Sequence, residues 1–392
     1  MGKPEIRFKG YTDEWEQRKL GEITESYSGG TPTAGKKEYY DGNIPFIRSG
    51  EISSDKTELF ISDEGLNNSS AKMVKTGDIL YALYGATSGE VSISKLKGAI
   101  NQAILAIRPY QNYDSQFLMQ WLRKSKETII GTYLQGGQGN LSGNIVKELL
   151  VDVPTSEEQK QIGNYFSNLD SLITLHQRKC DGVKSLKKYM LQKMFPQNEQ
   201  KVPEIRFEGF TEAWEQRKLG NVFKEYSEKN HTELPALTII QGGGTVKRED
   251  SDRNLMYDKS NLSNYKMVRK DDFIVHLRSF EGGLEKSSSD GIISPAYHTF
   301  HGDVTDSRFY YPYFRSYEFI KHKLVPHVYG IRDGRSIDID GMKTIEIPYT
   351  SIEEQQKIGD YLESIDNLIT LHQQKCEELK KIKKFMLQKM FV

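Results

Sequence analysis

The stretch LITLHQ, at residues 172–177, occurs a second time at residues 368–373 of this 392-residue chain. The likeness extends outward, because residues 157–195 match residues 353–391 at 24 of 39 positions. Another pair of copies lies further upstream, where PEIRFKGYTDEWEQRKLG (residues 4–21) matches PEIRFEGFTEAWEQRKLG (residues 203–220) at 14 of 18 positions. Two such copies must fold alike, so the chain is a duplicated unit and its fold has to satisfy both copies.

Between the copies lie two inserts, residues 22–155 and 221–351, that resemble each other only faintly. A nearly constant frame around two unlike inserts suggests that the frame has one mechanical role and the inserts have two different roles. We expect a strand at residues 79–83 in the first insert and another at residues 273–277 in the second. We expect a helix at residues 117–130, and the Gly-rich loops of both inserts are the expected places of function.

The repeated C-terminal segments show a seven-residue spacing typical of paired helices. In the first copy the two rows are Ile162, Leu169, His176, Val183, Met190 and Phe166, Ile173, Cys180, Lys187, Met194; in the second they are Ile358, Ile365, His372, Leu379, Met386 and Leu362, Ile369, Cys376, Lys383, Met390. Such a stripe needs a partner, and the other copy is the nearest one. Because the order of segments reads as a circle, we expect the two rods, each roughly 60 Å long, to pair antiparallel.

The expected fold class is therefore α+β: two α/β domains separated by two long antiparallel coiled-coil helices, with pseudo-two-fold symmetry. The expected boundaries are 1–155 for the first domain, 156–195 for the first spacer helix, 196–351 for the second domain and 352–392 for the second spacer helix. In the helix seam, His176, Cys180, His372 and Cys376 form either a polar layer that fixes the register or a zinc site. We favour the polar layer. We expect Lys187 and Lys383 to extend to solvent rather than to make specific contacts.

Composition narrows the classes of function. The chain is globular in composition, and it carries 54 Lys and Arg against 54 Asp and Glu. A protein that held DNA alone would usually carry an excess of cations, so we expect any DNA binding to need help from partners. The chain shows neither a long apolar run nor a signal segment, and its two cysteines give no disulfide framework. These features predict a cytoplasmic protein.

Sequence motifs for catalysis are weak or absent. Residues 30–36 (GTPTAGK) fit the first part of a phosphate-binding loop, but Lys37 replaces the Ser or Thr that would hold magnesium. The chain has no His-Glu-x-x-His, Gly-x-Ser-x-Gly or paired Cys-x-x-Cys motif, and it lacks the Asn-Pro-Pro-Tyr motif of amino-methyltransferases. We therefore predict a non-catalytic chain, with no catalytic residue, no metal and no cofactor of its own.

Several segments, taken in order, resemble one known family. In the first half they are GGTP (29–32), YYDGNIPF (39–46) and KTGDIL (75–80); in the second they are GIISPAY (291–297), Pro348, EEQ (353–355) and DNLI (366–369). This order of parts resembles the specificity subunits of type I restriction-modification systems, over almost the whole chain.

The resemblance implies that two recognition domains read the two halves of an asymmetric, interrupted DNA site while the helices act as a ruler. It also implies two methyltransferase (modification) subunits, which use S-adenosylmethionine to methylate adenine after base flipping, and restriction/translocase subunits that use ATP and magnesium.

Candidate DNA-reading residues are polar, Arg or Lys residues of the loops, because Arg and Lys reach guanine edges and Asn and Gln reach adenine edges. In the first insert they are Lys36, Lys37, Tyr39, Arg48, Tyr84, Gln138 and Asn140; in the second they are Gln241, Lys247, Arg248, Arg278, Tyr297, Arg332 and Arg335. For each one a solvated loop residue is an equal alternative. The first insert holds 13 Lys and Arg against 15 Asp and Glu, and the second holds 18 Lys and Arg against 19 Asp and Glu. We therefore expect no uniformly basic face.

Four repeated residues are assigned to the frame. Trp15 and Trp214 are expected to be packing anchors rather than base-stacking platforms, and Arg18 and Arg217 to serve the frame first and a phosphate second. Two other classes of function stay open: a structural scaffold whose inserts bind proteins, and a self-contained enzyme that uses residues 30–36.

Overall fold

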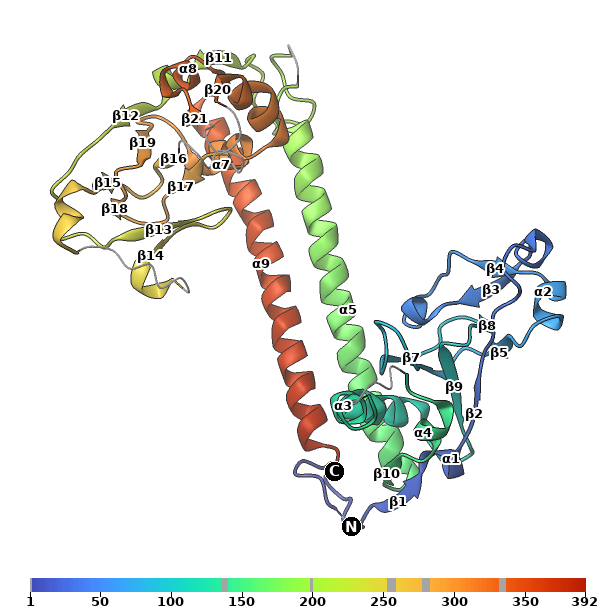
Figure 1. The fold of residues 1–392 in the computed structure, drawn as a ribbon. Helices are drawn as coiled ribbons and strands as arrows, with labels where there is room; N and C mark the ends of the chain where they lie inside the picture. Colours follow the sequence, from blue (N-terminus) through green and yellow to red (C-terminus); the bar gives the residue numbers. More distant parts are fainter. Residues whose placement is uncertain (1, 135–139, 198–199, 252–258, 277–282, 331–335) are drawn as a thin grey trace. The chain divides into compact units, whose positions relative to one another are not determined.

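The structure is a computed structural model that describes residues 2–134, 140–197, 200–251, 259–276, 283–330 and 336–392 (Figure 1). It forms two compact units. The first unit contains Met1–Gln177 and Gln373–Val392, and the second contains Arg178–His372. Each unit thus holds one insert, the beginning of the helix that follows the insert, and the end of the other long helix.

Two long helices contribute to both units: α5, Ser156–Lys193, and α9, Ile352–Lys389, each of 38 residues (Figure 1). Every residue of the four predicted heptad rows is buried or half-buried. The seven-residue pattern is therefore confirmed as the packing surface of both helices.

In the first unit the start of α5 packs against the end of α9. The rings of Phe166 and Phe391 lie 5.8 Å apart, and Cys376 Sγ lies 3.8 Å from Gln177 Oε1. Later residues of α5 thus meet earlier residues of α9, which is the antiparallel arrangement predicted from the circular order of segments. The second unit follows the same rule, because Lys187 contacts Asp366 while Met194 packs in one cluster with Ile358.

The two seam lysines make specific ion pairs, so the expectation that they extend to solvent is wrong. Lys187 Nζ lies 2.6 Å from Asp366 Oδ1 in the second unit. Lys383 pairs with Asp170 in the first unit, where Asp170 also accepts hydrogen bonds from Arg123 and Gln120 of the first insert. A lysine at a seam position needs a counterion when its head cannot reach bulk water, and the opposite helix supplies one.

Asp170→Asn tests the value of this cluster. Burial opposes the ionisation of Asp170, but Lys383 and Arg123 outweigh it and lower the pKa of its carboxyl. The stabilisation is therefore present above the ordinary Asp pKa of 3.8 and is lost as the pH falls through the lowered value. At pH 7 we expect the variant to lose about 1 kcal/mol in urea unfolding, a modest figure because the carboxylate is partly exposed. The loss should shrink in acid.

Asp366→Asn is the matched control, because Asp366 occupies the same place in the other copy and contacts Lys187 without an arginine. It should cost less than Asp170→Asn. Equal losses for the two variants at pH 7 would contradict the importance of the Arg123 contact.

The repeated N-terminal segments bind the ends of the long helices. Ile6 N–H donates to Lys389 O, and in the second unit Ile205 N–H donates to Lys193 O, both at 2.9 Å. Arg7 makes a two-pronged pair with buried Glu158, and Arg206 makes the same pair with buried Glu354. Each unit therefore uses the same contacts to join a helix end, a short segment and the beginning of the next helix.

The first unit carries a four-stranded antiparallel sheet in the order β2-β9-β6-β7 and a second sheet in the order β4-β3-β8-β5, in which only β3 and β8 are parallel. The short strands β1 and β10 pair with each other. Helix α3 covers the core, which gathers around Trp15 and Phe117. The elements are β1 Glu16–Lys19, α1 Leu20–Ile23, β2 Thr24–Ser28, β3 Ile44–Ile47, β4 Phe60–Ile61, α2 Asp63–Asn67, β5 Lys72–Val74, β6 Ile79–Ala82, β7 Val91–Ile93, β8 Gly98–Ile100, β9 Ile104–Pro109, α3 Ser115–Tyr133, α4 Gly143–Lys147 and β10 Leu150–Val153.

The second unit repeats this plan with differences. Its four-stranded sheet has the order β12-β19-β16-β17, and the pairs β11-β22, β13-β14, β15-β18 and β20-β21 surround it. The core gathers around Trp214 and a group of Phe and Tyr rings from α7. The elements are β11 Glu215–Lys218, α6 Leu219–Val222, β12 Lys224–Tyr226, β13 Leu237–Ile240, β14 Gly244–Lys247, β15 Lys266–Val268, β16 Phe273–His276, β17 Glu285–Lys286, β18 Gly291–Ile293, β19 Tyr297–His301, α7 Ser307–Phe314, β20 Val328–Tyr329, β21 Ser336–Ile337, α8 Ile339–Lys343 and β22 Glu346–Tyr349.

The α+β fold class is confirmed, as are the predicted helix within α3 and the strands at β6 and β16. The four domain boundaries drawn from the sequence stay a prediction.

Candidate nucleic-acid interface

The loop after β2 does not form a phosphate site of the P-loop kind. Residues 37–39 make a single 3-10 turn instead of opening a helix whose N-terminus could hold a phosphate. Tyr39 is only 5% exposed, and its hydroxyl accepts a hydrogen bond of 3.1 Å from Lys36 Nζ. Lys36 and Tyr39 thus stabilise the loop, whereas Lys37 is exposed and meets no counterion among the described residues.

Arg48 lies at the start of a turn and is held by two carboxylates. Its guanidinium lies 2.8 Å from Glu51 Oε1 and 2.9 Å from Glu58 Oε2. The hydrogen bond from Arg48 is the main reason why the pKa of Glu51 is lowered to about 2. To reach a base edge, Arg48 would have to leave both partners, so it is a weaker candidate than Lys37.

Tyr84 and Asn140 are brought together, although they lie 56 positions apart in the sequence. They form an isolated antiparallel bridge at the end of β6, and Asn140 is exposed there. Residues 135–139 lie between α3 and this bridge, and Gln138 is among them, outside the described residues. The sequence placed Tyr84 and Asn140 in separate loops, and the bridge makes them neighbours.

In the second unit the candidates form two groups. Gln241 lies in the turn of the β13–β14 hairpin, and Lys247 ends the same hairpin; both are exposed. Arg248 lies over the ring of Tyr265 at 5.3 Å, and the ring of Tyr297 lies 5.0 Å from His276. Burial raises the pKa of the Tyr297 hydroxyl, and the charge of Arg248 opposes that shift. Aromatic and cationic side chains of this kind suit contacts with bases and phosphates.

Three further candidates, Arg278, Arg332 and Arg335, also lie outside the described residues. Tyr329 lies two positions before residue 331, and it is 61% exposed on the short strand β20. Sequence reasoning missed Tyr329, although an aromatic residue beside the stretch GIRDGR was a usable signal. It now joins the candidates for DNA contact.

The repeated tryptophans are packing anchors, as predicted. Trp15 and Trp214 are fully buried, and each packs edge-on against the phenylalanine at the end of a long helix, Phe391 for Trp15 and Phe195 for Trp214. Arg18 pairs with Glu16, and Arg217 pairs with Glu215 and lies 3.6 Å from the centre of the Tyr349 ring. Both arginines therefore belong to the β1–β10 and β11–β22 ladders of the frame.

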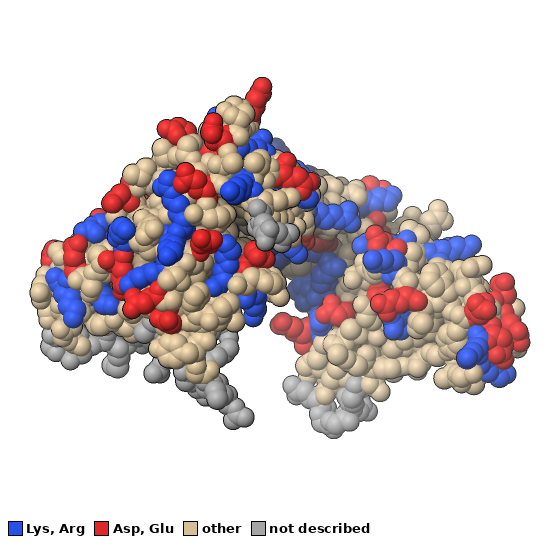
Figure 2. Space-filling model, turned by 90° about the horizontal axis from the view of Figure 1, so that it is seen from above, with Lys and Arg blue, Asp and Glu red and all other residues tan. Residues whose placement is uncertain are grey.

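Charges of both signs are mixed over the surface. Figure 2 shows Lys and Arg side chains beside Asp and Glu side chains on the face drawn, without a broad area of one sign among the described residues. Such a surface agrees with the neutral composition of both inserts. Phosphate neutralisation by this chain alone would be weak.

Metal and membrane features complete the survey. Among the residues that the structure describes, no group of three or more His, Cys, Asp or Glu side chains could hold a metal ion. His176, Cys180, His372 and Cys376 therefore supply no such group here, and the metal-free seam stays a prediction that metal analysis of the pure protein can check. No helix in the described part of the chain is long and apolar enough to cross a bilayer.

Comparisons with known proteins point to one family. A sequence model described as "Type I restriction modification DNA specificity domain" matches residues 12–185 and again residues 211–381. The chain is 24% identical over 393 residues to the type I restriction enzyme MjaVIII specificity subunit of Methanocaldococcus jannaschii, which covers 95% of this chain and 91% of that subunit. It is 27% identical over 177 residues to the EcoR124I/EcoR124II specificity subunit of Escherichia coli, with 43% of each chain covered.

A solved structure agrees with the fold. The S subunit of the type I restriction-modification system of M. genitalium superimposes with a TM-score of 0.65 at 16% identity, covering 100% of this chain and 99% of that one. At this level of identity the likeness concerns the fold.

Proposed function

Since this chain belongs to the family of type I restriction-modification DNA specificity subunits, we propose that it reads a two-part, asymmetric DNA site and positions catalytic subunits on it. The observation that carries the proposal is the double match of the family model, once over each repeat, around inserts of different sequence. Unlike inserts in like frames are what an asymmetric site requires.

Each insert would read one half-site through exposed or half-exposed residues of its loops and turns. The best placed in the first domain are Lys37, Tyr84 and Asn140, and in the second Gln241, Lys247 and Arg248. The paired helices would set the distance between the two half-sites, because each is a continuous helix of 38 residues with a firm register. The chain itself would be non-catalytic.

The proposed partners are two modification subunits and, in addition, restriction/translocase subunits. S-adenosylmethionine, ATP and magnesium would bind to those partners and not to this chain. A cytoplasmic location also stays a prediction. The neutral surface supports a shared task, in which the partners supply much of the phosphate clamp while this chain supplies base readout.

Each unit offers one exposed apolar area where a modification subunit could dock. The first apolar face consists of Leu172, Leu175, Ile382 and Phe385, and the second of Leu186, Tyr189, Leu368 and Leu371; their side chains are 37% to 57% exposed. The residues of one face correspond to those of the other in the repeat. Equivalent apolar faces in both units support two copies of one partner.

The proposal is tested by assembling the chain with its modification subunits and selecting duplexes from a random library. We expect two short base-specific segments, different from each other and separated by a fixed number of unspecified pairs. Lys37→Ala and Lys247→Ala should each weaken binding modestly and lower its salt dependence or relax one half-site.

The same assay separates the alternatives. A complex that retains duplexes without base preference would favour a protein-binding scaffold. Hydrolysis of ATP or cleavage of DNA by the purified chain alone would favour a self-contained enzyme.

A further inference from the structure

The β13–β14 hairpin is a feature of the second domain that the four-stranded sheet does not include. Its strands pair over four residues each, with Gln241, Gly242 and Gly243 in the turn. β13 lies beside β18 and β14 beside β17, so the hairpin rests on the domain by one side. At the turn Ile240 and Gln241 are exposed, which leaves these side chains free to meet a ligand.

A buried carboxylate holds the turn from beneath. Glu285 of β17 is 7% exposed, and its Oε1 accepts a hydrogen bond of 2.7 Å from Gly242 N–H. Its Oε2 accepts one of 2.9 Å from the Tyr311 hydroxyl, and the Arg315 guanidinium pairs with Oε1. Tyr311 lies in α7, and Arg315 is the first residue after the end of α7. Glu285 thus ties the tip of the hairpin to the end of a core helix.

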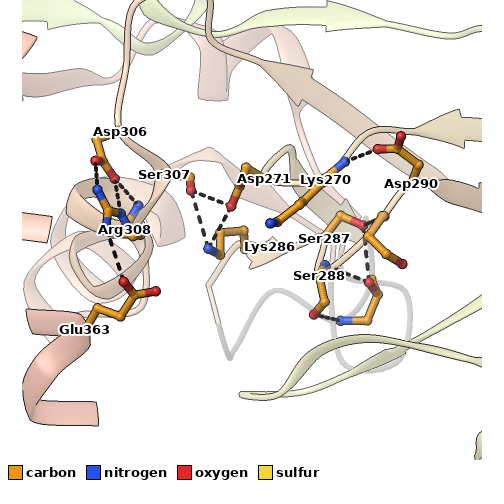
Figure 3. A network of polar contacts seen from close by, with 12 residues as sticks. Lys270, Asp271, Lys286, Ser287, Ser288, Asp290, Asp306, Ser307, Arg308 and Glu363 are labelled. Carbon is orange, nitrogen blue, oxygen red and sulfur yellow. Dashed lines mark hydrogen bonds and ion pairs between the residues drawn. The ribbon is translucent and has the colours of Figure 1, made fainter. Parts of the chain in front are cut away.

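Further contacts fix the second strand of the hairpin. Thr245 N–H donates to Ser288 Oγ at 3.2 Å, and Ser288 N–H donates back to Thr245 Oγ1 at 2.9 Å. Figure 3 shows Ser287 and Ser288 in one group of contacts and, beside it, a second group in which Lys286 and Ser307, at the start of α7, both contact Asp271. The hairpin is therefore fixed at its turn by Glu285 of β17 and along its second strand by Ser288, which follows β17.

The turn lies close to Arg315, which adds to the preference for glycine at position 242. Gly242 has φ of +78°, and a Cβ built on it would lie 3.1 Å from Arg315 Nη2. Positive φ and this close approach both favour glycine. The position of the turn is thus specified by the guanidinium beneath it.

The first domain has no carboxylate at the position that corresponds to Glu285. Strand pairing places Ser92 opposite Leu80, where the second domain has Glu285 opposite Ile274. Arg123 stands nine residues after the cap Asp114, as Arg315 stands nine after the cap Asp306, yet Arg123 pairs with Asp170 of α5. The shared scaffold therefore does not need a buried carboxylate here. Burying a charge costs stability unless it is well paired, so its use in one domain alone points to a demand for a fixed turn.

We propose that Glu285 is a positioning residue for the turn at residues 241–243 and that, through this turn, it determines which bases the second domain prefers. Its own side chain is buried and does not contact DNA. The inference rests on the proposed function, because it takes the second domain to be a base reader. A glutamine at the tip suits bidentate contacts with adenine, and such contacts need a fixed backbone.

Glu285→Gln in the assembled complex with modification subunits tests the inference. The substitution keeps the shape of the side chain and removes the charge that holds Arg315 and Gly242. In the random-duplex selection we expect the base preference of one half-site to fall by about tenfold, in line with the loss of one good base contact, while the other half-site is unchanged. Tyr311→Phe removes one donor only and should give a smaller loss in the same half-site.

Glu90→Gln is the matched control, because Glu90 pairs with Lys126 on the surface of the first domain. It should leave both half-sites unchanged. Unchanged half-sites in a folded Glu285→Gln complex, or equal losses in both, would overturn the inference. If Glu285→Gln does not fold, Tyr311→Phe decides alone by the same criteria. A wild-type complex without any two-part preference would instead overturn the proposed function.

Discussion

Glu354→Ala should destabilise the second unit by about 3–5 kcal/mol, the loss expected when one partner of a buried ion pair is removed. Glu354 accepts two hydrogen bonds from Arg206, at 2.6 and 2.8 Å, a third of 3.0 Å from Trp214 Nε1 and a fourth from the Thr350 hydroxyl. Its carboxylate is 1% exposed and the Arg206 side chain 10%. The substitution would strand a buried guanidinium and leave the indole N–H without its acceptor. Denaturant unfolding, monitored by hydrogen exchange in each unit separately, would measure the loss of unfolding free energy.

The first unit supplies the control. Glu158→Ala breaks the corresponding pair with Arg7, but Glu158 receives nothing from Trp15, whose Nε1 has no hydrogen-bond partner among the described residues. Glu158→Ala should therefore cost less than Glu354→Ala, by about 1–2 kcal/mol for the two hydrogen bonds that only Glu354 accepts, from Trp214 and Thr350. A cost below 1 kcal/mol for Glu354→Ala would show that the pair is not what joins the segment 203–207 to α9.

The second large effect concerns assembly: Phe385→Asp should release the modification subunit from the first apolar face, and Tyr189→Asp should release the one on the second. A central aromatic residue of an interface often contributes 2 kcal/mol or more, so we expect affinity at the changed face to fall about 30-fold or more. Mass measurement of the assembled complex should then give one modification subunit per chain for each single variant and none for the double variant.

The register of the helices explains why each face is continuous. Asp170 is level with Lys383, so residue 382 of the antiparallel helix is level with residue 171 and residue 385 with residue 168. The four residues of the first face thus span about two turns of helix on the two partners. They also share heptad positions, because Leu172 and Leu175 flank Ile173 as Ile382 and Phe385 flank Lys383. In an antiparallel pair such positions lie on the same side of the seam.

Tyr317→Asp is the control for the assembly experiment, since Tyr317 is 72% exposed and belongs to neither face. It should leave two modification subunits bound. The substitutions on the faces alter half-exposed side chains, so the free chain should unfold within about 0.5 kcal/mol of the wild type. Two subunits on the double variant would refute docking at these faces.

The repeat and the heptad rows were enough to predict most of the architecture. Seven-residue spacing predicted the buried faces of α5 and α9, and the circular order of segments predicted their antiparallel pairing. Trp15 and Trp214 occupy the same position in the two copies of the N-terminal repeat, and this predicted that both pack in the cores. These features follow from local periodicity and duplication, which a single sequence displays directly.

Side-chain partners across long separations could not be predicted. Lys383 pairs with Asp170 from 213 positions away, and although the heptad spacing places Lys383 in the seam, nothing in the local sequence identifies Asp170 as its partner. From the sequence Arg48 was a candidate to contact DNA, but in the structure it pairs with Glu51 and Glu58. Tyr39 was a candidate too, but it is buried. The residues expected to read bases remain predictions for the same reason, since groove contacts depend on loop positions that only tertiary structure sets.

The contacts that hold each insert join residues common to both copies: Arg7 or Arg206 to a glutamate of the next helix, and a backbone N–H to the last turn of the other helix. A foreign insert that ended in the same residues would be seated without changes elsewhere. Under the proposed function, one recombination event inside the gene would then replace the recognised half-site in a single step. The two apolar faces proposed for the modification subunits would stay unchanged.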